Sequence, residues 1–66
     1  MLYRLNNRGA EALGDDDGKP VTIAEVQDIY VDIMGGSNDD IAVMPDGLYL
    51  IAETGERTMI AEALDK

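Results

Sequence analysis

The 66-residue chain contains no cysteine, histidine, phenylalanine or tryptophan. Without cysteine, disulfides are excluded, and so are zinc sites built from cysteine or histidine. Catalytic triads that use a histidine base lack their parts as well. Without phenylalanine and tryptophan, the core must come from aliphatic side chains and the three tyrosines, and we expect the tyrosines and Met34, Met44 and Met59 to belong to it. Together these absences predict a non-enzymatic protein with no metal and no cofactor.

Basic residues are also scarce. Five Lys and Arg stand against fourteen Asp and Glu, and the formal net charge is −9. Such an excess of negative charge disfavours binding to nucleic acid or to an anionic membrane surface and favours a basic protein partner. No run approaches the roughly 20 apolar residues that a membrane span needs. Residues 1–8 include two arginines but no apolar run of a signal peptide behind them, which predicts a cytoplasmic protein.

The chain is long enough for one small acidic domain, residues 1–66. Its hydrophobic fraction of 45% indicates a folded domain rather than a disordered acidic tail. A domain of this size buries only about 60% of its unfolded surface, so its core is marginal. Self-association as a homo-dimer is therefore one structural alternative, in which the acidity serves only solubility.

Short elements are expected in the first part of the chain. Leu2–Leu5 is rich in apolar residues and predicts a strand, and Asn6–Gly9 predicts a turn. Ala10–Leu13 could form a single helical turn, which Gly14 would end. The Asp-, Gly- and Pro-rich residues 15–20 predict a loop.

The clearest pattern in the chain predicts a helix over Thr22–Met34. Thr22 and Glu25 form a Thr-x-x-Glu capping box, and Gly35 with Gly36 would end the helix. Alternating β-branched residues leave a strand as the alternative. The apolar residues at helical spacing are Ile23, Val26, Ile29, Tyr30, Ile33 and Met34.

Three apolar runs separated by turn signals follow, and they predict an antiparallel meander. A C-terminal helix over Glu56–Leu64 is the alternative to the last run, because that segment is rich in helix-forming residues. The expected fold is therefore α+β, with one amphipathic helix packed on a small antiparallel sheet of three to four strands. The runs are Ile41–Met44, Leu48–Ala52 and 57–61, and the turns are at 45–47 and 54–55.

Glu25, Asp28 and Asp32 are the first candidate site. In an α-helix they would fall within an arc of about 60° opposite the apolar residues and form a ridge about 10 Å long. No Lys or Arg lies between Pro20 and Leu50 to neutralise it. We expect this ridge to occupy a basic groove of a nucleic-acid-binding protein, with carboxylates in place of phosphates. A solvated helix face is the simpler alternative.

Asp15, Asp16 and Asp17 are the second candidate site and would extend the same anionic surface. A small Ca²⁺- or Mg²⁺-binding protein is a further alternative. An EF-hand is excluded, because Leu13 and Ala24 stand at its first and twelfth positions when Gly18 is placed sixth. In its size, acidity and lack of catalytic residues, the chain is similar in general character to small phage-encoded inhibitors such as anti-CRISPR proteins, although no motif assigns it to a family.

Overall fold

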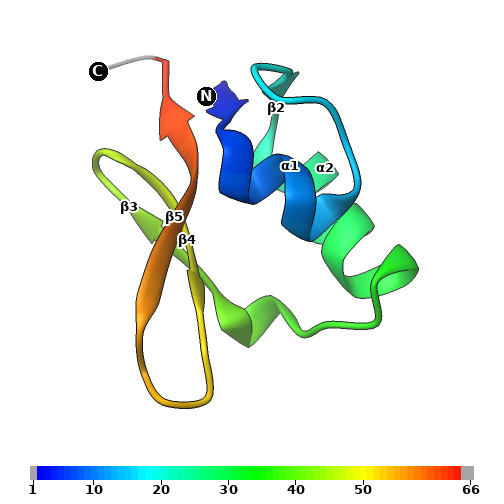
Figure 1. The fold of residues 1–66 in the computed structure, drawn as a ribbon, viewed down its shortest axis with the longest axis vertical. Coiled ribbons are helices and arrows are strands. Elements are labelled where there is room, and N and C mark those ends of the chain that lie inside the picture. Colours follow the sequence, from blue (N-terminus) through cyan, green and yellow to red (C-terminus); the bar gives the residue numbers. More distant parts are fainter. Residues whose placement is uncertain (1, 65–66) are drawn as a thin grey trace.

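The computed structural model describes residues 2–64, and it confirms the α+β class. One sheet has five strands in the order β2-β1-β5-β4-β3, and every neighbouring pair is antiparallel (Figure 1). The elements in chain order are β1 (Tyr3–Leu5), α1 (Asn7–Leu13), β2 (Pro20–Val21), α2 (Ile23–Gln27), the π-helix η1 (Asp28–Ile33), the 3₁₀ turn η2 (Asn38–Asp40), β3 (Ile41–Met44), β4 (Gly47–Ile51) and β5 (Arg57–Ala63).

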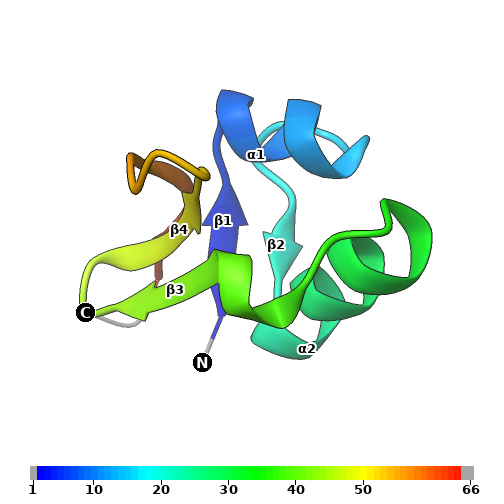
Figure 2. The same ribbon diagram turned by 90° about the horizontal axis from the view of Figure 1, so that it is seen from below.

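The long strand β5 joins the two halves of the sheet. It pairs with β1 on one side and with β4 on the other, so the N-terminal strand completes the meander. Figure 2 shows α1 and α2 on the β1–β2 side and β3–β4 on the opposite side, and Figure 1 likewise shows both helices next to β2 and away from β3 and β4. Ala61 and Ala63 are buried whereas Glu62 is exposed, and this period of two belongs to a strand. The alternative of a C-terminal helix is therefore wrong.

The fifth strand, β2, was not expected. Pro20 pairs with Arg4, and Val21 pairs with Tyr3. A strand of two residues is too short to show an alternating pattern, and its proline reads as a loop signal. Proline is nevertheless compatible with this position, because β2 is an edge strand.

The first helix begins earlier than the sequence indicates. Asn6 does not start a turn; it is the N-cap of α1, and its side chain accepts a hydrogen bond of 2.8 Å from the backbone N–H of Gly9. The helix therefore covers Asn7–Leu13 rather than one turn from Ala10. Gly14 ends it in the left-handed region, with φ of 66°, as expected for a C-terminal glycine.

The second helix has the predicted start but a different second half. The capping box of Thr22 and Glu25 is present. The α-helix extends only to Gln27, and Asp28–Ile33 continues it as a π-helix. The N–H of Met34 accordingly donates to the carbonyl of Ile29, five residues earlier, at 3.0 Å. The chain leaves the helix at Gly35, whose φ is +75°.

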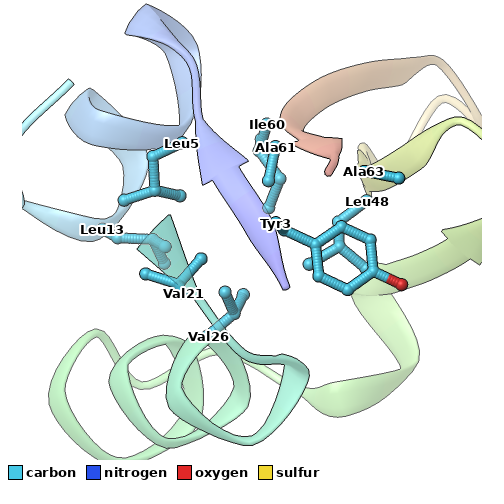
Figure 3. Close-up of a cluster of buried hydrophobic side chains, with 9 residues drawn as sticks. All are labelled: Tyr3, Leu5, Leu13, Val21, Val26, Leu48, Ile60, Ala61 and Ala63. Carbon is cyan, nitrogen blue, oxygen red and sulfur yellow. The ribbon is translucent and has the colours of Figure 1, made fainter. Parts of the chain in front are cut away.

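Aliphatic side chains and Tyr3 form the core, and the partly buried Tyr30 packs against it. Tyr49, Met44 and Met59 were also expected in the core, but they are half-buried and lie outside it. α1 and α2 close it over the inner face of the sheet (Figure 3). β5 contributes adjacent buried residues because Leu48 pairs with Ala61 and Tyr49 with Met59, which leaves Ile60 as the extra residue of a β-bulge. The buried cluster is Tyr3, Leu5, Leu13, Val21, Val26, Leu48, Ile60, Ala61 and Ala63.

The end of the second helix departs from the predicted apolar face. Ile33 is 73% exposed and Met34 is 50% exposed, so both were wrongly assigned to the core. Each residue of a π-helix turns the chain less than the about 100° of an α-helix. Over Asp28–Ile33, the smaller rotation per residue therefore turns Ile33 away from the side of the helix on which Val26 is buried.

Candidate partner-binding surface

Glu25, Asp28 and Asp32 are all exposed on the second helix. Asp28 and Asp32 form no ion pair with any residue in the range 2–64. Both lie in the π-helical segment, so the arc expected from α-helical geometry does not apply to them. Ile33, the residue after Asp32, is exposed as well, so the surface of the second helix includes an apolar side chain as well as carboxylates.

Glu25 also has a structural role. Its Oε1 accepts hydrogen bonds from the backbone N–H of Thr22 at 3.3 Å and from Thr22 Oγ1 at 3.2 Å. Thr22 Oγ1 in turn accepts from the N–H of Glu25 at 3.2 Å. The carboxylate lies in the first turn of α2, where negative charge is favourable. A partner that binds Glu25 would therefore compete with the cap of the helix.

Asp15 is less available than its neighbours. Its Oδ2 forms an ion pair of 2.9 Å with Lys19 Nζ, and its Oδ1 accepts from the N–H of Asp16 at 2.9 Å. The hydrogen bond from Lys19 is the main reason why the pKa of Asp15 lies below its ordinary value, and the N–H of Asp16 adds to it. Asp16 and Asp17 are exposed.

Lys19 connects the aspartate loop with the second helix. Its pKa is raised chiefly by the hydrogen bond to Asp15, then by the charge of Asp15, and also by the negative charges of Glu25 and Asp16. In the chain, Lys19 stands between the aspartate loop and the N-cap of α2, Thr22. The two predicted sites adjoin, but a cation lies at their junction.

Further carboxylates lie beyond both predicted sites. From Val21 to Glu56, every Asp or Glu is exposed except Asp40, which is half-buried, and no Lys or Arg is present. The absence of Lys and Arg between Pro20 and Leu50 was evident from the sequence, but only the carboxylates of the helix and of the loop were assigned to a site. The carboxylates of the segment are Glu25, Asp28, Asp32, Asp39, Asp40, Asp46, Glu53 and Glu56.

One of these carboxylates is held by a neighbour. Asp46, in the turn between β3 and β4, accepts a hydrogen bond of 2.7 Å from the hydroxyl of Tyr49. That hydrogen bond is the largest cause of a raised pKa of Tyr49, followed by desolvation and the charge of Asp46. Tyr49 is half-buried, so the pair lies at the surface of the sheet.

Within residues 2–64, there is no pocket and no group of three or more acidic side chains that could hold a metal ion. Asp15, Asp16 and Asp17 in particular do not form such a group. In the same part of the chain, no helix has the length and apolar character needed to cross a membrane. The chain matches no family model, and no curated protein or solved structure matches it significantly.

Proposed function

We propose that this chain is a small acidic binding protein that inhibits or regulates a basic partner, namely a nucleic-acid-binding protein, in the cytoplasm. The proposal rests on the charge of one segment: between Val21 and Glu56, every charged side chain is negative. Within this segment, Asp28 and Asp32 are exposed and form no ion pair with any residue in the range 2–64. A surface that served solubility alone would not require the exclusion of every Lys and Arg from that segment, because mixed charges also keep a protein soluble.

The carboxylates of Glu25, Asp28 and Asp32 would occupy positions that phosphates take in the partner's groove. Lys and Arg side chains that bind phosphate also bind carboxylate through charge-assisted hydrogen bonds. Asp16 and Asp17 extend this surface, whereas Asp15 already has Lys19 as its partner. Binding of this kind is accelerated by electrostatic steering and weakened by salt.

A pull-down tests the proposal. The immobilised protein should retain a basic nucleic-acid-binding protein from a nuclease-treated lysate at about 50 mM salt and release it at about 500 mM, where screening is much stronger. The combined variant Glu25→Gln, Asp28→Asn and Asp32→Asn should retain less of it. Glutamine at position 25 can still complete the capping box, so the helix should survive.

Asp28→Asn alone removes one charge from the helix face, and its matched control, Glu11→Gln, removes one charge at an exposed position of α1, outside the Val21–Glu56 segment. The control should bind nearly as the unchanged protein does. Retention of no basic protein at low salt would overturn the proposal. Equal losses in the two variants would show that total charge, rather than the helix face, determines binding.

Self-association is a second candidate function, and the exposure of Ile33 and Met34 favours it. These two residues lie next to each other at the end of η1, and both are at least half exposed. An apolar pair of this kind can be covered by a second copy of the chain. Sedimentation at increasing concentration decides: a monomer throughout would exclude this candidate.

A further inference from the structure

The two edges of the sheet differ in how they are protected. At one edge, β2 has only two residues, one of which is Pro20, and Lys19 precedes it. A short strand, a proline and a lysine all discourage pairing with another strand. At the other edge, β3 consists of the apolar residues Ile41–Met44 and contains neither a charge nor a proline. Only the β3 edge therefore lacks this protection.

At the β3 edge, apolar surface is uncovered on the face of the sheet that carries the core. Val43 lies directly opposite Leu48, so their side chains share this face. Leu48 is fully buried, whereas Val43 is 54% exposed, because no strand follows β3 in the described sheet. Backbone N–H and C=O groups of an edge strand that point away from its neighbour are also available for pairing. A sixth strand would cover Val43 and satisfy those groups.

We propose that β3 accepts an extended segment of the basic partner as an additional strand of the sheet. This inference rests on the proposed function and deepens it, since it names the element that the partner occupies and the kind of segment that fits. In such complexes, main-chain hydrogen bonds provide affinity, and alternate side chains provide specificity. The segment should carry apolar residues that cover Val43.

The charges at both ends of β3 determine which kind of strand can pair with it. Asp39 and Asp40 precede the strand, and Asp46 follows it in the turn. A second copy paired along β3 would bring carboxylates close to carboxylates in either orientation, and like charges on neighbouring strands destabilise pairing. A segment with Lys or Arg at both ends places opposite charges there instead. The edge therefore fits a basic strand better than a copy of itself.

Two synthetic peptides test the proposal on the full chain. The first is a fluorescent peptide of alternating valine and threonine with two lysines at each end, and the second carries prolines in place of the threonines. Both have the same charge, but proline cannot donate the hydrogen bonds of a strand. We expect fluorescence anisotropy to show binding of the first peptide and at least about tenfold weaker binding of the second, since several main-chain hydrogen bonds are lost.

Variants locate the binding site. Val43→Lys places a charge on the exposed edge and should weaken binding of the alternating peptide at least about tenfold. Thr54→Lys adds the same charge in the exposed turn between β4 and β5 and should have little effect. Circular dichroism checks that both variants fold. In NMR spectra, the amide shifts caused by the peptide should centre on Ile41–Met44.

Three results would overturn docking at β3: equal binding of the two peptides, no binding of either, or equal effects of Val43→Lys and Thr54→Lys. A concentration-dependent dimer that Val43→Lys dissociates would also overturn it, because the occupant would then be a second copy. The pull-down separates this failure from that of the proposed function. A retained basic protein supports the function whatever the peptides do, and its absence at low salt removes the function itself.

Discussion

The backbone of Gly9 lies directly against the carbonyl oxygen of Ile60, so closely that a Cβ on Gly9 would overlap with it. The same carbonyl accepts a hydrogen bond of 3.0 Å from the N–H of Asn6. Since Leu5 pairs with Ala61, Asn6 and Ile60 continue the β1–β5 register by one more residue. The end of the β1–β5 pairing thus provides the point at which the start of α1 is attached to the sheet.

Replacement of Gly9 by alanine should destabilise the protein. Alanine favours a helix over glycine by about 1 kcal/mol, but overpacking against a backbone carbonyl costs about 1–3 kcal/mol. The balance of these two effects should lower the free energy of unfolding of Gly9→Ala by up to about 2 kcal/mol in urea titrations. Arg8→Ala, at an exposed position of the same helix, should change it by less than about 0.5 kcal/mol. A stabilising effect of Gly9→Ala would contradict the close contact.

Asn6 should contribute through two separate hydrogen bonds. Its side-chain oxygen caps α1 at the N–H of Gly9, and its Nδ2 donates to the carbonyl of Met59 at 2.7 Å. Asn6→Ser keeps a good cap but is too short to reach Met59, so it should cost about 1 kcal/mol. Asn6→Ala loses both bonds and should cost about 2 kcal/mol. Equal losses of unfolding free energy in the two variants would show that the bond to Met59 contributes nothing.

Features that depend on neighbouring residues were predictable from the sequence. The capping box of Thr22 and Glu25 involves residues three apart, and Gly14 ends the helix that precedes it. The cap that Asn6 forms on Gly9 is equally local but was missed because residues 6–9 read as a turn. The bond of Asn6 to Met59, 53 residues away in the chain, has no local signal. The strand at Pro20 was missed for the same reason, since it exists only through pairing with β1.

The candidate surface was likewise predictable only where it depends on residues that are close in the sequence. The exposure of Asp28 and Asp32 followed from their place opposite the apolar residues of the helix. The π-helical winding of that segment did not, because the apolar spacing is equally consistent with an α-helix throughout. The open edge at β3 could not be predicted either, since strand order is a property of the whole sheet.

Ile33 and Val26 should respond differently to truncation, although both belong to the predicted apolar face. Val26 is fully buried, and Val26→Ala should lower the free energy of unfolding by about 2 kcal/mol through lost burial and a cavity. Ile33 is 73% exposed, and Ile33→Ala should change it by less than about 0.5 kcal/mol. Urea denaturation of the two variants measures both values. A comparable loss for Ile33→Ala would indicate that the helix stays α-helical and turns Ile33 inward.

The hydrogen bond between Tyr49 and Asp46 should stabilise the folded protein less at alkaline pH. The hydrogen bond to Asp46 raises the pKa of Tyr49 above its ordinary value of 10.0, so the folded state holds the phenol proton more tightly than the unfolded state. This contribution to stability is complete below about pH 10 and is lost as the pH rises through the raised pKa. The tyrosinate absorbance of Tyr49, isolated by comparison with Tyr49→Phe, should appear at lower pH in Asp46→Asn, because the carboxylate charge is gone. An unchanged titration in Asp46→Asn would show that Asp46 does not hold the hydroxyl proton in solution.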